Sequence, residues 1–245
     1  WRSVPRGGTA AGPPDPAGLA DHYGEITGID NSVGMIRSFL RRAGLAGTTL
    51  VWFQSDNGSL KRTGPAGTGG LRGYKNSLYE GGIRVPSAVE WPGMIPAGQA
   101  CAEPVASVDF LPTIAAILGI PEAALPQPMD GRSVLPLLQG EPFDRGGPLH
   151  FRHLGRLAAI DGSLKLLVPD LGKPKLELYD LAADPHEAEN LAQDRADLAA
   201  RMYAEAMAWS ASVDAGLEGL DYGAGPLPPP APPVDLADSP LYHVL

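Results

Sequence analysis

The spacing of apolar residues predicts a long amphipathic helix followed directly by a buried strand. From about residue 24 to residue 43, apolar side chains recur every three or four positions, which places them on one face of a helix. Gly44 and Gly47 are expected to end this helix. The β-branched and aromatic run at 48–54 then predicts a strand, so that helix and strand alternate as in a βαβ layer. The apolar positions of the helix are Ile26, Ile29, Val33, Ile36 and Leu40.

The middle of the chain predicts one more strand and one more helix. The strand is expected at 87–91, where Pro86 and Pro92 bound a short run. The helix is expected at 109–118, with Asp109 as its candidate N-cap and Gly119 as its stop.

The last third of the chain predicts a small α+β subdomain. Segments 157–160 and 164–168 flank Asp161-Gly162, a strong signal for the turn of an antiparallel hairpin. A further strand is expected at 176–179 and a helix at 194–210, with Met202 in the core.

Composition along the chain divides it into four parts. Residues 1–20 are rich in Gly and Pro and are interpreted as a loop or linker. Residues 21–147 read as the end of an α/β domain, and residues 148–222 as the α+β subdomain. Residues 223–245 form a Pro-rich tail, for which a spacer is the favoured interpretation.

The first candidate site follows the strand at 48–54. That run ends in Ser55-Asp56-Asn57-Gly58, and ligands of open parallel sheets lie just beyond the carboxyl ends of strands. A carboxylate beside an amide carbonyl suits a hard cation such as Ca²⁺ or Mg²⁺. The competing interpretation is a simple turn, because Asp-Asn and Asn-Gly are common in turns.

A glycine-rich segment with three cations, residues 67–86, supplies the second candidate site. Glycines allow the backbone to approach a ligand closely, and Lys75 can act as a point charge on an anion. Metal ligands followed by such a loop suggest a site for phosphate or sulfate esters. Alternatively, the segment is a flexible connection whose Lys and Arg side chains are solvated.

Taken in order, these motifs resemble the type I sulfatases of the alkaline-phosphatase superfamily. The similarity extends from about Tyr23 to Trp209, and the ordered set is far more specific than any single motif. The matching segments are Ser55-Asp56-Asn57-Gly58, Leu71-Arg72-Gly73-x-Lys75-x-Ser77, residues 79–86, Trp91-Pro92-Gly93, Ile95-Pro96-Ala97-Gly98, residues 108–114, Asp130-Gly131-Arg132-Ser133, Leu178-Tyr179-Asp180-Leu181 and Asp184-Pro185 with Glu187 and Asn190-Leu191-Ala192.

The resemblance implies a fold and a set of roles. The implied fold is α/β, the C-terminal part of a mostly parallel sheet sandwiched by helices, with a small α+β subdomain of antiparallel strands and a C-terminal helix. Asp56 and Asn57 match ligands of a divalent cation, usually Ca²⁺, with Mg²⁺ as the alternative. Lys75 matches a lysine that binds the sulfate and stabilises charge on the ester oxygen. Arg84 is interpreted as structural.

The family's nucleophile is not found in the chain. The family places it in Cys/Ser-x-Pro-x-Arg, where the Cys or Ser is converted to formylglycine. Cys101 stands in Cys101-Ala102-Glu103-Pro104-Val105, which does not fit, and is expected to pack as a small buried or partly buried thiol. The first pair of metal-binding aspartates is missing as well. The nucleophile and formylglycine are therefore expected upstream, and the chain is interpreted as the C-terminal part of a sulfatase.

Composition restricts the partners. The net charge of -9 and the pI of about 5.0 argue against nucleic-acid binding through a basic face. No apolar run approaches the ~20 residues of a membrane-spanning helix. A single cysteine rules out an internal disulfide. Oligomeric state and compartment stay open, although family members are often periplasmic, secreted or lysosomal.

The leading hypothesis is a sulfuric ester hydrolase that acts on a small-molecule or sugar sulfate ester. Two alternatives remain: a phosphoesterase or phosphonate monoester hydrolase of the same superfamily, and an inactive sulfatase remnant.

Overall fold

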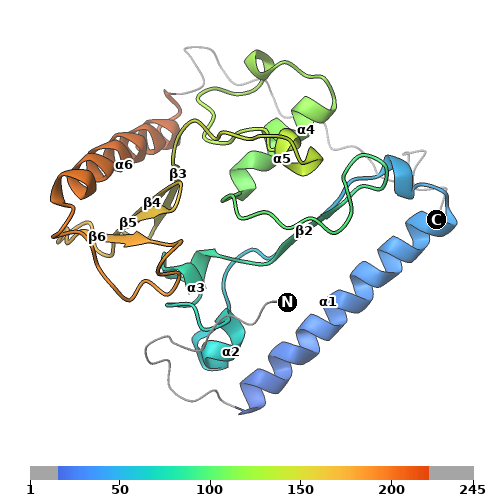
Figure 1. Ribbon diagram of the computed structural model, residues 1–245, viewed down its shortest axis with the longest axis horizontal. Helices are drawn as coiled ribbons and strands as arrows, with labels where there is room; N and C mark the ends of the chain where they lie inside the picture. The colour runs from blue at the N-terminus through green and yellow to red at the C-terminus, as the bar shows by residue number, and fades with distance from the viewer. Residues whose placement is uncertain (1–15, 221–245) are drawn as a thin grey trace. The chain divides into compact units, whose positions relative to one another are not determined.

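The computed structural model describes residues 16–220 (Figure 1). The described residues up to Ser210 belong to one compact unit, and those from Ala211 belong to a second. The predicted Pro-rich tail lies outside the described residues, as does the predicted loop up to residue 15. The predicted boundary near residue 147 stays a prediction.

The first helix, α1 (Pro16–Arg42), begins about eight residues before the predicted start. Residues 16–20 are therefore helical, and their assignment to a loop was wrong. Proline is favoured in the first turn of a helix, and Ala and Leu are good helix formers, so the local sequence supports the earlier start. The helix ends before Gly44, whose φ of 71° suits glycine. Ile26, Ile29 and Ile36 are exposed within the described residues.

Strand β1 (Val51–Gln54) pairs with β2 (Ser87–Glu90) in an antiparallel ladder that places Val51 opposite Glu90. Both strands were predicted, but the parallel pairing expected for this sheet is not seen among the described residues. Between the two strands the chain forms only the short helical segments η2, α2 and α3, and no long crossover helix of the kind that usually joins parallel strands. An ion pair between Arg37 and Glu90 ties α1 to β2.

Short helical segments connect these elements to the rest of the unit. They are η1 (Ala46–Thr48), η2 (Lys61–Thr63), α2 (Gly64–Thr68), α3 (Glu80–Ile83), η3 (Ser107–Asp109), α4 (Phe110–Ile117), η4 (Glu122–Ala124) and α5 (Leu135–Gln139). Of these, α4 is the helix predicted at 109–118.

A four-stranded antiparallel sheet follows, in the order β3-β4-β5-β6. The strands are β3 (Leu149–His153), β4 (Arg156–Asp161), β5 (Leu164–Val168) and β6 (Glu177–Asp180). The predicted hairpin is confirmed, with its turn at Gly162 and Ser163. The prediction missed β3.

Both faces of this sheet are covered. Helix α6 (Ala196–Leu217) packs through Ala199, Met202 and Ala206 on a cluster that includes Leu166. The opposite face, through Ala158 and Leu167, packs on Leu78. The sheet therefore lies between α6 and the segment that leads into α3, which brings the second half of the chain against the candidate site.

Asp109 is fully buried at the start of α4, but it does not cap that helix with its side chain. Its carboxylate instead accepts hydrogen bonds from the backbone N–H groups of Ala106 (2.8 Å) and Arg132 (2.9 Å). Arg145 also donates to this carboxylate, from Nη1 to Oδ1 (3.0 Å) and from Nη2 to Oδ2 (2.6 Å). Asp109 is thus the N-cap residue of α4, as predicted, but its side chain makes no capping hydrogen bond because these partners engage both carboxylate oxygens.

None of the helices described between Pro16 and Leu217 is long and apolar enough to cross a membrane.

Removing the guanidinium of Arg145 should destabilise the fold. We expect Arg145→Met to lower the free energy of unfolding by about 3 kcal/mol, since it leaves the buried Asp109 carboxylate without its ionic partner. Arg132→Met is the matched control, because the Arg132 side chain is exposed and lies 3.6 Å from an equally exposed Glu122. Urea denaturation of both variants measures the difference, and equal losses would contradict the role of the buried pair.

Candidate functional site

Asp56 and Asn57 leave the carboxyl end of β1 directly, as the sequence predicts. The Asp56 side chain is exposed and Asn57 is half-buried. Asn57 Nδ2 donates a hydrogen bond to Asp56 Oδ1 (2.9 Å), and Ser55 Oγ donates to the Asn57 carbonyl (3.1 Å). The hydrogen bond between Asn57 and Asp56 turns these two side chains toward each other and leaves Asp56 Oδ2 and Asn57 Oδ1 available to a ligand.

These two oxygens fit a hard cation as one part of a ligand set. Ca²⁺ takes about six to eight oxygen ligands, so two adjacent side chains form only a part of such a site. Within the described part of the chain, no cluster of three or more His, Cys, Asp and Glu side chains could hold a metal. A complete ligand set would need further oxygen atoms beyond these two.

The loop that carries Lys75 lies directly beside the Asp56–Asn57 loop. The backbone N–H of Lys75 donates to the Ser59 carbonyl (2.9 Å), only two residues beyond Asn57. The Lys75 side chain is half-buried, and no described residue pairs with its ammonium group. The structure thus brings the two predicted segments together, while the roles of their side chains stay predictions.

Glycine backbones make this approach possible. Gly58 donates from its N–H to the Gly82 carbonyl (2.9 Å), and a Cβ on Gly58 would lie only 1.9 Å from the Gly81 carbonyl oxygen. On the other side of α3, a Cβ on Gly82 would lie 2.1 Å from the Ser77 carbonyl oxygen. Helix α3 is therefore in backbone contact with the loop of Asp56 and with the loop of Lys75.

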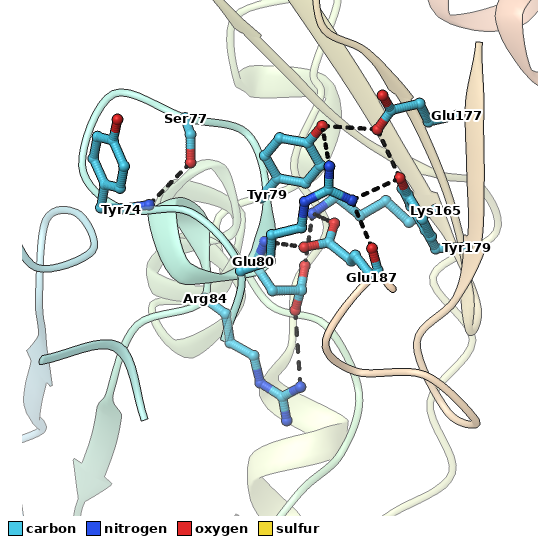
Figure 2. A network of polar contacts seen from close by, with 10 residues as sticks. Tyr74, Ser77, Tyr79, Glu80, Arg84, Lys165, Glu177, Tyr179 and Glu187 are labelled. Carbon is cyan, nitrogen blue, oxygen red and sulfur yellow. Dashed lines mark hydrogen bonds and ion pairs between the residues drawn. The ribbon is translucent and has the colours of Figure 1, made fainter. Parts of the chain in front are cut away.

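A buried ion cluster, which we call the ion triad, connects α3 to the four-stranded sheet (Figure 2). It consists of Lys165 of β5 with Glu80 of α3 and Glu187 of the loop after β6. Lys165 Nζ lies 2.9 Å from Glu80 Oε1 and 2.8 Å from Glu187 Oε1, and all three side chains are buried. Burial raises the pKa of Glu187, and the neighbouring Lys165 charge opposes that rise.

Arg72 forms a second connection to the same sheet. Its guanidinium donates to the Tyr179 hydroxyl (3.0 Å), the Tyr79 hydroxyl (3.1 Å) and the Glu187 carbonyl (2.6 Å). Both tyrosine hydroxyls donate in turn to the Glu177 carboxylate, at 2.8 and 2.7 Å (Figure 2). Burial and this carboxylate raise the pKa of Tyr79 and of Tyr179, so both hydroxyls stay protonated as donors.

The sequence analysis did not identify the ion triad. One signal was present, because Lys165 is the only charged residue of a strand that is otherwise Leu-x-Leu-Leu-Val. A lysine in a strand buried on both faces needs an anionic partner. The sequence alone does not show which carboxylates supply it, since both lie more than twenty residues away.

Two other predicted positions are placed by the structure. Arg84 is exposed and lies 3.8 Å from Glu80, one helical turn away; its structural role stays a prediction. Cys101 is exposed, so the expectation of a packed thiol was wrong. It lies in an irregular segment between β2 and η3, where the described structure has no helix or strand to cover it.

Comparison with known proteins shows which family the chain resembles. The Sulfatase family model matches residues 5–120, the part that holds Asp56, Asn57 and Lys75. Steryl-sulfatase of Rattus norvegicus is 40% identical over 137 residues, which are 52% of this chain and 24% of that protein. Over these residues the chain is similar to the sulfatases. A sulfatase of Formosa agariphila is 31% identical over an alignment 228 positions long, which covers 78% of this chain and 39% of that protein.

A sulfatase fold is seen in the structural comparison too. The structure of Ps i-CgsB in complex with k-i-k-neocarrahexaose aligns with a TM-score of 0.69 and 26% identity, over 80% of this chain and 44% of that one. The α/β fold class is thereby confirmed, as a C-terminal portion of the alkaline-phosphatase-like fold. The chain spans about a quarter of the length of the steryl-sulfatase relative.

The glycine contact between the Asp56 loop and α3 can be tested by adding one methyl group. We expect Gly58→Ala to lower the free energy of unfolding by about 1–3 kcal/mol, because its Cβ would meet the Gly81 carbonyl. Gly34→Ala, in α1 with open space around it, should instead stabilise the protein by about 0.5–1 kcal/mol. Thermal unfolding measures both changes; a neutral Gly58→Ala would show that the contact is not tight.

Proposed function

We propose that the chain forms the cation- and sulfate-binding part of the active site of a sulfuric ester hydrolase. In this proposal Asp56 and Asn57 are ligands of a divalent cation, Ca²⁺ with Mg²⁺ as the alternative, and Lys75 binds the sulfate. The nucleophile belongs to a segment outside these 245 residues, because no Cys or Ser of the chain stands in Cys/Ser-x-Pro-x-Arg.

The observation that carries the proposal is the hydrogen bond between the Lys75 N–H and the Ser59 carbonyl. It places the loop of the candidate ammonium beside the loop of the candidate metal ligands, in a chain similar to the sulfatases. Transfer of a sulfuryl group spreads negative charge over its oxygens. A bound divalent cation would stabilise part of that charge, and a preorganised ammonium such as that of Lys75 stabilises another part.

The substrate is proposed to be a small-molecule or sugar sulfate ester. Among the relatives, one is named for steryl sulfate and one was solved with a neocarrahexaose. Lys75 and the cation would recognise the sulfate group that such compounds share, so this part of the site would not distinguish between them.

The activity is tested by complementation. The chain is co-expressed with a sulfatase segment that carries Cys-x-Pro-x-Arg and with the enzyme that generates formylglycine, and hydrolysis of p-nitrophenyl sulfate and of a phosphonate monoester is compared. We expect sulfate hydrolysis, and a fall in kcat of about 100-fold or more for Lys75→Ala because an ammonium that stabilises the developing charge is lost. Lys173→Ala, at an exposed loop position, is the matched control.

The alternatives make different predictions in the same assay. Preferred hydrolysis of the phosphonate would support a phosphonate monoester hydrolase. A protein that assembles but turns over neither substrate would support an inactive remnant.

Cation binding can be measured on the chain alone. We expect weak Ca²⁺ binding, with a dissociation constant of about 10⁻⁴ M or higher, because Asp56 and Asn57 are only part of a ligand set. Asp56→Ala should abolish it, whereas Asp161→Ala, at the exposed end of β4, should not. Isothermal titration calorimetry measures both; submicromolar binding, or binding that survives Asp56→Ala, would contradict the assignment.

By itself, the 245-residue chain should not hydrolyse p-nitrophenyl sulfate, since it has no candidate nucleophile in the required motif. Turnover by the purified chain that disappears in Lys75→Ala would contradict this expectation.

A further inference from the structure

We propose that Lys165 is a positioning residue for the candidate cation site: through Glu80 and Glu187 it fixes α3, and α3 fixes the loops of Asp56 and Lys75. The inference rests on the proposed function, because it assigns Lys165 a purpose at that site. Lys165 itself touches neither loop and would not contact the substrate.

The first step is the burial of Lys165. Its side chain has no exposed surface, and it lies on the face of the sheet that packs against the segment leading into α3. Burying an ammonium is costly, and a well-packed apolar side chain is often at least as stabilising at such a position. An ion cluster here therefore suggests a requirement for specific geometry, which charge and hydrogen bonds impose more strictly than apolar packing.

The second step is the link from Lys165 to the backbone of α3. Glu187 pairs with Lys165 through Oε1 and accepts a hydrogen bond from the backbone N–H of Glu80 through Oε2 (2.7 Å). Glu187 has a φ of 56°, which is uncommon for a residue other than glycine. Its carbonyl accepts the hydrogen bond from Arg72, so backbone and side chain of Glu187 are both engaged. Lys165 also pairs with the Glu80 side chain and thus holds the first residue of α3 from two sides.

The third step runs from α3 to the candidate ligands. Gly82 accepts the hydrogen bond from Gly58, the residue after Asn57, and the Gly81 carbonyl occupies the space where a Gly58 side chain would lie. Gly81 donates from its N–H to the Arg72 carbonyl (2.7 Å), three residues before Lys75. A displacement of α3 would therefore shift both loops.

Other charged and polar groups surround the ion triad, and Arg156 of β4 donates to the Asn76 carbonyl in the loop of Lys75 (2.9 Å). Arg84 lies near Glu80 on the solvent side of α3, at 3.8 Å. Arg72, Tyr79, Glu177 and Tyr179 form the adjoining network on the sheet side (Figure 2). Lys165 is the cation between the two triad carboxylates, so its removal leaves Glu80 and Glu187 facing each other without an ammonium between them.

The test measures hydrogen exchange of individual backbone amides in the full chain. In Lys165→Met we expect the protection factor of the Gly58 amide to fall about tenfold or more, while amides of β4 keep their protection. Arg145→Met is the matched control, because it removes the guanidinium from another buried ion pair, at the start of α4. In this variant the protection of the Gly58 amide should fall no more than that of the β4 amides.

A pH series separates positioning from general stabilisation. In Lys165→Met, acidification should restore Gly58 protection, because burial raises the pKa of Glu187 and its protonation removes the repulsion between the two facing side chains. The protein with Lys165 intact should show no such recovery. If Lys165→Met does not fold, Glu187→Gln serves instead. It keeps an acceptor for the Glu80 N–H but removes the charge, and the Gly58 amide should again lose protection selectively.

The inference is overturned if Gly58 keeps its protection in Lys165→Met, or if all amides lose protection equally. Failure of the proposed function looks different. If the unaltered chain binds no Ca²⁺ through Asp56, the cation assignment falls, whereas selective loss at Gly58 would still show that Lys165 positions this loop.

Discussion

The candidate site depends on one buried ammonium. Lys165 Nζ stands between the carboxylates of Glu80 and Glu187, in a place where water does not reach it. A buried ammonium needs paired carboxylates close to it. Because one of these carboxylates belongs to Glu80, the ion pairs also hold the single turn of α3 in place. The turn has four residues, too few to be stable as an isolated helix. Its position is set by the ion triad, which connects it to the sheet, and by the glycine contacts, which connect it to the neighbouring loops.

The glycine contacts connect α3 to the loops of Asp56 and Lys75. Gly58, Gly81 and Gly82 let three stretches of backbone approach within hydrogen-bonding distance, where any side chain would keep them apart. The loop of Asp56 and the loop of Lys75 are therefore positioned by backbone contacts, which leaves their side chains available for the proposed ligands. This arrangement suits the proposed site, in which two positive groups, a divalent cation and an ammonium, would surround one anionic group.

Local sequence predicted the parts of this site but not the way they are joined. The strand before Asp56, the hairpin around Gly162 and the core helix with Met202 follow from patterns that are contained in a few neighbouring residues. The antiparallel partner of β1 and the partners of Lys165 do not, because each depends on residues far away in the chain. Exposed Cys101 was mispredicted for a related reason: residue type favours burial, but only the surrounding fold decides whether anything covers it.

The same long-range contacts have a consequence for how the protein folds. Glu80 is 85 residues from Lys165, and Arg72 is 115 residues from Glu187. Contacts of such high sequence separation carry a loop-closure cost that local hairpins do not, so they form slowly. During synthesis, residues 56–82 leave the ribosome well before β5 and the Glu187 loop exist. The loop of Asp56 therefore gains these contacts only after the C-terminal sheet has been made, so folding of that sheet is the event that orders the candidate site.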